Sequence, residues 1–224
     1  MVIKQRAVSR DQKQERRERI LDAARELFAG APYEEISMLH VAERAVLAKG
    51  TLYLYFNTKE ELFLALLARE IEDWFDEIDK MMEDLRSRGK PCPPEEFSRL
   101  LSQSLVSRPV AVRLIVISQA ILEHNIDYTS ALSYKQMLNA HIVQTGSILE
   151  ECLPYLQPGQ GARLILWIYL LVIGVQSVAE PAPVVQRTLT EPGMETFQVD
   201  FQLEISAILT VLLDGLAASY RRNS

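Results

Sequence analysis

Cysteine, histidine and long apolar runs are scarce in this sequence, and each shortage excludes a kind of protein. The two cysteines, Cys92 and Cys152, form no CxxC pair, and the three histidines fall in no metal-ligand spacing. We therefore expect no metal site, no cofactor and a reducing compartment. The longest uninterrupted apolar run, 164–175, is shorter than the roughly 18–20 residues that span a bilayer. Because the charged N-terminus also lacks a signal-peptide core, the sequence predicts a cytoplasmic protein that does not enter the membrane.

Motifs of catalysis are missing as well. The chain contains no GxSxG, GxxxxGK or HExxH run, and we find no nucleophile with a recognisable acid and base. The sequence therefore predicts a protein that is not an enzyme.

Charge is distributed unevenly along the chain. The net charge is −6, but residues 1–59 carry eleven Lys and Arg against eight Asp and Glu, or +3, whereas residues 60–224 carry thirteen against twenty-two, or −9. Lys4, Arg6 and Arg10 form a short basic arm, which either contacts phosphates or is a solvated tail. The acidic total does not exclude nucleic-acid binding, because the basic part lies at the N-terminus.

Apolar residues recur at helical spacing, and proline and glycine interrupt them at wide intervals, so we expect an all-α fold. Helices are predicted over 11–29, 37–45, 48–56, 58–88, 95–107, 109–124, 128–153, 160–180 and 197–220, with a loop over 181–196. Gly30 is placed to end the first helix in a left-handed conformation, and Thr58 to Glu61 form a capping box before the longest helix.

The first predicted helix and the helix over 58–88 each carry an apolar stripe, so each is expected to bury one face. The helix over 58–88 is about 45 Å long at 1.5 Å per residue and can reach across two domains. The stripes contain Ile20, Leu21, Ala24, Leu27 and Phe28 in the first helix, and Leu62, Phe63, Leu66, Leu67, Ile71, Trp74, Phe75, Ile78, Met82 and Leu85 in the second.

The two C-terminal predicted helices differ in pattern. Residues 164–175 are apolar on all sides and require burial all round, whereas the 197–220 helix has a single apolar stripe. This combination near the chain end suggests a partner subunit, and the alternative is a central helix of a monomeric bundle. We expect a homodimer interface that includes Leu164, Leu171, Ile208, Leu209 and Leu212.

Residues 37–56 are predicted to form two short helices around a tight turn. A helix that enters the major groove of DNA excludes bulk at its N-terminus and needs flanking donors for phosphate oxygens. Gly50 removes a side chain where the backbone could approach DNA, and donors are supplied by Lys49, Thr51, Tyr53, Tyr55 and Lys59. The pattern alone leaves an alternative, in which Leu52, Tyr53 and Phe56 are core residues of a small helical unit.

The stretches ILDAARELFAG, VAERA and KGTLYLYFNTKEELFLALL, in this order over about residues 16–67, resemble the N-terminal domain of the TetR family of regulators. The resemblance implies a three-helix DNA-binding domain over 1–58, with its helix-turn-helix at about 37–56. It also implies a C-terminal helical bundle over 59–224 for effector binding and dimerisation, although this part resembles the family in pattern only.

The resemblance assigns roles to the residues of this segment. It makes Ala48 to Phe56 the recognition helix, with Lys49 and Thr51 facing DNA. Tyr53 and Tyr55 are placed near phosphates and Lys59 on a phosphate. Ser37 stands where the family often has a threonine that caps the preceding helix near the DNA backbone.

Two residues depart from the family pattern. Val46 stands in the turn where glycine is usual, and Ala48 stands where serine or threonine usually caps the recognition helix. A β-branched residue at positive φ is strained, and a lost cap costs about 0.5–2 kcal/mol of stability. Either the turn has a different geometry here, or this domain is less stable than its relatives.

The resemblance implies a ligand-responsive repressor that binds palindromic double-stranded operator DNA as a homodimer. We expect its effector to be a small hydrophobic or aromatic molecule. Candidates for the effector site, each with core packing as its alternative, are Ser118, His141, Trp167, Tyr169 and Gln176. The alternative function is a helical ligand-binding or interaction protein of the same fold with weakened or lost DNA binding.

Overall fold

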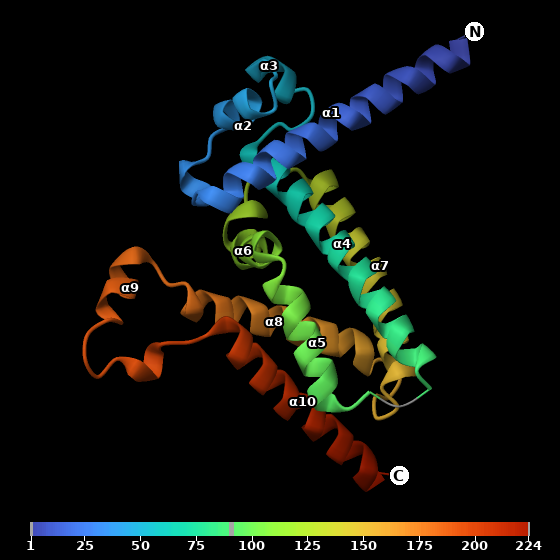
Figure 1. The fold of residues 1–224 in the computed structure, drawn as a ribbon. Helices are drawn as coiled ribbons and strands as arrows, with labels where there is room; N and C mark the ends of the chain where they lie inside the picture. The colour runs from blue at the N-terminus through green and yellow to red at the C-terminus, as the bar shows by residue number, and fades with distance from the viewer. Residues whose placement is uncertain (1, 90–91, 224) are drawn as a thin grey trace. The chain divides into compact units, whose positions relative to one another are not determined.

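The computed structural model describes the backbone of residues 2–89 and 92–223 and the side chains of 12–89 and 92–222. The described chain contains helices and no strand, so the prediction of an all-α fold is confirmed (Figure 1). It divides into two compact units. The N-terminal unit contains residues 1–69 and 117–134, and the C-terminal unit contains residues 70–116 and 135–224.

The elements follow the predicted order closely. They are α1 (Val2–Gly30), η1 (Tyr33–Glu35), α2 (Met38–Arg44), α3 (Lys49–Leu52), α4 (Lys59–Ser87), α5 (Pro94–Val106), α6 (Pro109–Ile117), η2 (Ser118–Leu122), α7 (Tyr128–Cys152), α8 (Gln160–Ala179), α9 (Pro183–Thr188), η3 (Glu195–Phe197) and α10 (Phe201–Asn223). Helices α4 and α7 each contribute residues to both units.

The core of the N-terminal unit forms where the apolar stripe of α1 meets the start of α4. Of the five stripe residues predicted for α1, four are buried and Leu27 is half-buried. Phe63 of α4 packs edge-on against Phe28, with ring centroids 5.6 Å apart, and against Tyr33, at 5.1 Å. Helix α2 packs against α1, and α3 packs against α2.

The C-terminal unit has a second core, built from the remainder of the α4 stripe. Phe75, Ile78 and Met82 are each at most 2% exposed, as are Phe97 of α5 and Leu164 of α8. Helix α10 packs against both α5 and α8. The helical periodicity of the sequence therefore predicted which face of α4 is buried in each unit.

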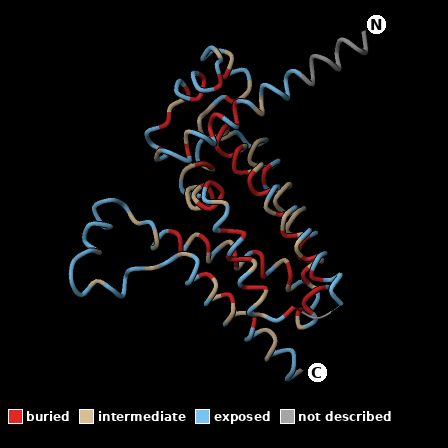
Figure 2. The backbone as a smooth tube through the Cα atoms, viewed as in Figure 1, coloured by how far each residue is buried: buried red, intermediate tan, exposed pale blue. Residues whose placement is uncertain are grey.

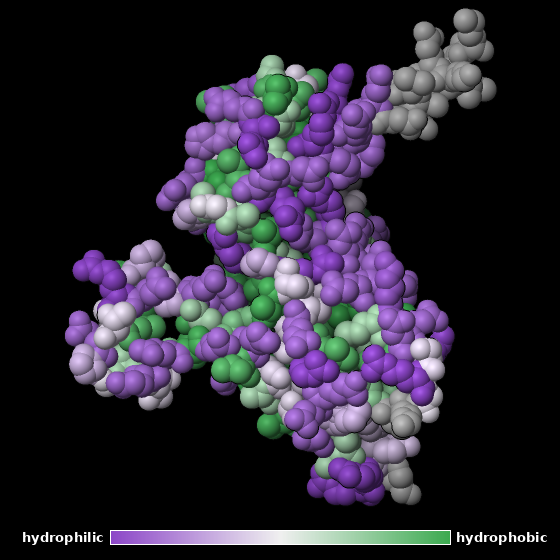
Figure 3. All heavy atoms as spheres, in the orientation of Figure 1, coloured by the Kyte–Doolittle hydropathy of each residue, from purple (hydrophilic) through white to green (hydrophobic). Residues whose placement is uncertain are grey.

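Helix α8 is buried on only one side within the chain. Leu164, Ile168 and Val172 are buried, but Leu166 is 48% and Leu170 is 55% exposed. The alternative of a central helix in a monomeric bundle is therefore wrong. Figure 3 shows apolar side chains at the surface near the end of α8 and the start of α10.

Length and composition alone would allow two of the helices to cross a membrane. In the described residues these are α8 and the Phe201–Arg222 part of α10, and α5 and α6 would qualify only together, as a pair bent by 85°. The uninterrupted apolar run of residues 164–175 predicted no such helix. The helices are longer than the uninterrupted run because they also contain isolated polar residues, which end a run but do not end a helix.

Three details of the predicted elements are corrected by the structure. Gly30 is the last residue of α1 and does not have a positive φ. The predicted helix over 109–124 changes from α to π geometry at Ser118. The predicted loop over 181–196 contains the short helix α9 and the start of η3, and Figure 2 shows most of this segment exposed.

Helices α7 and α8 cross at two glycines. The peptide group of Gly146 lies so close to Gly161 that a Cβ built on Gly161 would be 2.0 Å from the carbonyl oxygen of Gly146. A Cβ built on Gly146 would be 2.6 Å from the amide nitrogen of Ala162. The Gly161 amide donates to Glu150 Oε1 at 2.8 Å. Only residues without a side chain permit this backbone contact.

Candidate nucleic-acid interface

Helix α2 begins with a capping box. The Ser37 hydroxyl accepts a hydrogen bond from the His40 amide at 3.2 Å, and the Ser37 amide donates to His40 Nδ1 at 3.3 Å. Both bonds satisfy amides at the start of the helix, which otherwise lack partners. The Ser37 hydroxyl proton is still available to donate, so the predicted contact with a DNA phosphate is compatible with its capping role.

The turn between α2 and α3 retains the left-handed geometry that favours glycine. Val46 has a φ of 56° and is the one described residue other than glycine with a positive φ. Its side chain is 87% exposed, so packing does not compensate for the strain, which costs roughly 1–2 kcal/mol. Of the two alternatives for this departure, the structure favours a turn of ordinary geometry at lower stability.

Ala48 occupies the N-cap of α3. Its backbone is extended, with φ −67° and ψ 142°, and no side chain caps the helix. Helix α3 is shorter than the predicted 48–56 helix, because it ends at Leu52 and continues as turns through Phe56. The recognition segment is therefore held mainly by what it buries.

The recognition segment contains buried, half-buried and exposed residues, and Thr51 and Tyr55 are half-buried. Leu52 and Phe56 are buried, as the core alternative for this segment requires, whereas Tyr53 is 42% exposed and Lys49 is exposed. A Cβ built on Gly50 would meet nothing within 4 Å, so the protein's own packing does not require glycine there. The segment is thus anchored by two buried side chains, and its exposed groups include Lys49, Gly50, Tyr53 and the apolar Leu54.

Lys59, predicted to contact a phosphate, is engaged inside the N-terminal unit. Its Nζ donates to the carbonyl oxygen of Tyr33 and lies 3.7 Å from the centroid of the Tyr33 ring. Burial lowers the pKa of Lys59 and raises that of Tyr33, whose hydroxyl donates to Glu60 Oε1 at 3.1 Å. The ammonium group has three donors, so the bond to Tyr33 leaves donors for the predicted phosphate contact, which stays a prediction.

The predicted cap of α4 is present in an altered form. Thr58 Oγ1 accepts from the Glu61 amide at 3.0 Å, but the Glu61 carboxylate accepts from the amide of Asn57 rather than that of Thr58. The Thr58 hydroxyl also donates to the carbonyl oxygen of Asn125 at 3.0 Å. The start of α4 is thereby tied to the 117–134 segment of the same unit.

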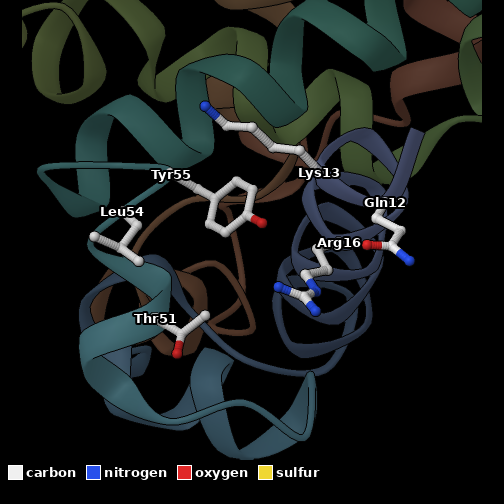
Figure 4. A pocket seen from close by; sticks show the side chains of 6 residues that line it. All are labelled: Gln12, Lys13, Arg16, Thr51, Leu54 and Tyr55. Carbon is white, nitrogen blue, oxygen red and sulfur yellow. The ribbon is translucent and has the colours of Figure 1, made fainter. Parts of the chain in front are cut away.

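A polar groove of about 330 Å³ opens between α1 and the end of the recognition segment (Figure 4). It is lined by Gln12, Lys13, Arg16, Thr51, Leu54 and Tyr55. Of these residues, Thr51 and Tyr55 are predicted DNA contacts, whereas no role was predicted from the sequence for the three α1 residues. Arg16 follows Lys13 by three residues and Gln12 by four, and these spacings, which bring side chains together on one face of a helix, were the available signal. The basic arm of Lys4, Arg6 and Arg10 lies outside the described side chains.

The five predicted effector-site residues have varied surroundings. Ser118 is buried in the N-terminal unit, and Gln176 is buried in the C-terminal unit. His141 is half-buried and stacks on Phe75, with ring centroids 5.2 Å apart, as core packing would require. Trp167 and Tyr169 are half-buried, and the Arg163 guanidinium lies 5.7 Å from the Trp167 ring. Among the described residues, no group of histidine, cysteine or carboxylate side chains could hold a metal ion.

Two of the five predicted interface residues cannot contact a partner. Leu164 and Leu209 have no exposed surface in the single chain, so a second subunit would bury nothing more of them. Leu171, Ile208 and Leu212 are half-buried. The sequence pattern identified the apolar side of each helix but did not separate the subunit's own core from its surface.

Comparison with known proteins covers both halves of the chain. The family of bacterial regulatory proteins named tetR matches residues 20–66, and the tetracyclin repressor-like C-terminal domain matches residues 68–220. The HTH-type transcriptional repressor KstR of Rhodococcus jostii (strain RHA1) is 43% identical over 100 residues, which are 43% of this chain and 42% of KstR. The matches to the three KstR relatives thus span less than half of their length.

Solved structures share the fold over most of the chain. The fatty acid degradation regulator FadR from Bacillus halodurans has a TM-score of 0.55 at 19% identity, covering 90% of this chain and 96% of FadR. FadR from Bacillus subtilis in complex with stearoyl-CoA has a TM-score of 0.52 at 20% identity, covering 88% and 96%. At this level of identity the structural likeness supports the fold alone.

Proposed function

Because the chain belongs to the TetR family of bacterial transcriptional regulators, we propose that it is a cytoplasmic repressor that binds a palindromic operator as a dimer. A small apolar effector releases it from DNA. The observation that carries this proposal is the outward face of the recognition segment, where Lys49, Gly50 and Tyr53 are exposed while Leu52 and Phe56 anchor the segment. The members of this family are transcriptional regulators, which agrees with the expectation that the chain is not an enzyme.

The recognition segment suits the major groove because its N-terminal residues are small or bear donors. Lys49 and Thr51 supply an ammonium and a hydroxyl group, which bond to phosphate oxygens and base edges. Gly50 leaves space for the backbone to approach DNA. The open space around Gly50 in the free protein supports a role toward an external partner.

The first prediction concerns this segment. Lys49→Ala, Thr51→Ala and Tyr53→Ala should each weaken binding by about tenfold or more, because each removes a contact worth about 1–3 kcal/mol. The probe is a duplex that the parent protein selects from a random-sequence pool, and binding is measured by fluorescence anisotropy. Far-ultraviolet circular dichroism should stay unchanged, since Lys49 and Tyr53 are exposed and Thr51 is half-buried.

The control is Leu39→Ala on α2, which removes a 44% exposed side chain outside the recognition segment. If all three variants bound the duplex as tightly as the parent, the recognition segment would be misplaced. If the parent selected no duplex at all, the alternative of an interaction protein that has lost DNA binding would replace the proposed function. The strained turn at Val46 and the uncapped Ala48 are the features that favour this alternative.

We place the dimer interface on exposed stripes of α8 and α10. Residues four apart on one face of each helix are all exposed, and they are apolar or small: Leu166, Leu170, Gly174 and Val178 in α8, and Leu203, Ala207, Val211 and Gly215 in α10. Rows with this spacing form the ridges that interlock when helices pack. A partner subunit that covers them would also explain why helices apolar enough to span a membrane occur in a regulator.

The effector is proposed to be a lipophilic molecule that binds in the C-terminal unit. The apolar core of that unit supports this chemistry, and the structurally similar FadR from Bacillus subtilis was solved in complex with stearoyl-CoA. Helix α4 runs without a break from the N-terminal unit into the C-terminal unit, so a change at one end is communicated to the other. Release requires that the effector bind the DNA-free arrangement more tightly.

The second prediction tests this chemistry with the same duplex. Stearoyl-CoA, the free fatty acid and a sterol are compared with sugars and nucleotides, CoA serving as the control for its headgroup. An apolar compound should lower the affinity for DNA by about 5- to 150-fold, which corresponds to a coupling of about 1–3 kcal/mol. Release by the polar compounds alone would contradict the proposed effector class, and release by none would indicate a constitutive repressor.

A further inference from the structure

We propose that the groove between α1 and the recognition segment binds a backbone phosphate of the operator, with Lys13 and Arg16 as its cationic contacts. The inference rests on the proposed function, because it extends the DNA-binding surface to a helix outside the helix-turn-helix. The lining supplies an ammonium, a guanidinium, an amide, a threonine hydroxyl and a phenol, with Leu54 as its apolar member.

The residues converge on the groove from two elements. Gln12, Lys13 and Arg16 lie on one face of α1, and Thr51 and Tyr55 come from the recognition segment. Figure 4 shows the Tyr55 hydroxyl directed toward α1, on the side where Arg16 lies. Hydroxyl, guanidinium and ammonium groups are the donors that proteins use for phosphate oxygens, and a guanidinium can donate two parallel bonds to one phosphate.

The described salt bridges of α1 do not involve Lys13 or Arg16. Arg69 of α4 pairs with Glu18 at 3.2 Å and with Asp22 at 2.8 Å, so these two carboxylates of α1 are neutralised by another helix. Arg17 lies within 3.7 Å of Glu18. Lys13 and Arg16 pair with no carboxylate among the residues whose side chains the structure describes, and both are exposed. An anion in the groove would therefore meet two cations that no internal pair already satisfies.

The position of Thr51 indicates which anion the groove binds. It lines the groove and also belongs to the segment proposed to face the bases, so a ligand in the groove lies next to DNA bound by that segment. A backbone phosphate of the same duplex is an anion and lies next to the bases, so it can occupy the groove while the segment contacts the bases. The contact fixes the position of the protein on the duplex without reading sequence, because phosphates are the same at every step.

The test compares Lys13→Gln, Arg16→Gln and Tyr55→Phe with the parent on the duplex that the parent selects from a random pool. Anisotropy is measured between about 50 and 300 mM salt. Lys13→Gln and Arg16→Gln should each weaken binding by about tenfold and reduce the slope of log affinity against log salt concentration by about 1. The variant with both substitutions should reduce this slope by about 2. Tyr55→Phe should weaken binding by only a few-fold and leave the slope unchanged, since it removes no charge.

Arg99→Gln on α5 is the charge-matched control, because it removes the same charge from an exposed position in the other unit. Wild-type affinity and slope in Lys13→Gln and Arg16→Gln would overturn the groove proposal. The proposed function would survive that result if Lys49→Ala still lost binding. A changed sequence preference in Arg16→Gln would also overturn it, because a phosphate contact weakens all sequences alike.

Discussion

Replacing Gly161 with alanine should destabilise the C-terminal unit by about 3 kcal/mol, the upper end of the usual cost of overpacking. The added methyl group would lie 2.0 Å from the carbonyl oxygen of Gly146, and backbone atoms cannot move aside as a flexible side chain can. Helices α7 and α8 would have to separate, which also weakens the bond between the Gly161 amide and Glu150. Gly146→Ala should have a smaller effect in the same direction, since its closest contact is 2.6 Å.

Urea unfolding followed by tryptophan fluorescence measures this effect. Both tryptophans, Trp74 and Trp167, lie in the C-terminal unit, so the signal reports that unit alone. Gly30→Ala, which lies in the N-terminal unit, is the control and is compared with Gly161→Ala by far-ultraviolet circular dichroism, because it adds the same methyl group at a helical glycine with nothing within 4 Å. A Gly161→Ala protein with the midpoint of the parent, at equal protein concentration, would show that α7 and α8 do not cross at these glycines.

Val211→Glu should convert the dimer into monomers and reduce operator affinity by about 100-fold or more. Val211 is 74% exposed in the chain and lies in the middle of the proposed α10 stripe, where a carboxylate would be buried against the partner without a cation. Loss of the dimer removes the gain from engaging two half-sites, about 34–36 Å apart, with one molecule. Sedimentation at micromolar concentration and anisotropy with the selected duplex measure the two effects.

Val143→Glu is the matched control, since Val143 is a 55% exposed valine on α7, outside both stripes. Leu209→Glu would be uninformative, because Leu209 has no exposed surface and the change would unfold the subunit instead. A Val211→Glu protein that sediments as a dimer would exclude the α10 stripe from the interface. A parent protein that sediments as a monomer would refute the dimer itself.

In the recognition segment some site residues could be predicted from the local sequence, whereas the surroundings of others depend on tertiary packing. The resemblance and the donor chemistry indicated Lys49, Thr51 and Tyr53, and the structure leaves Lys49 and Tyr53 exposed and Thr51 half-buried. Lys59 was assigned by the same resemblance, yet its ammonium lies against Tyr33, which is distant in sequence. A contact between segments is invisible to a motif, because the motif describes only its own stretch of chain.

The basic face of α1 illustrates the same limit. In the sequence, Lys13 and Arg16 are two of several charged residues in the first predicted helix, and charged residues on a helix are commonly only solvated. Their significance comes from Tyr55 and Thr51, which the fold brings to the opposite side of the groove.

The sequence by itself determined the all-α class, the order of the helices and the buried faces of α1 and α4, because helical periodicity is a local property. It also determined the family, through a motif of contiguous residues. The tertiary structure alone decided which apolar residues of α8 and α10 face the subunit core and which face outward. It alone decided that α7 and α8 meet through their glycines, because both depend on the packing of segments far apart in the chain.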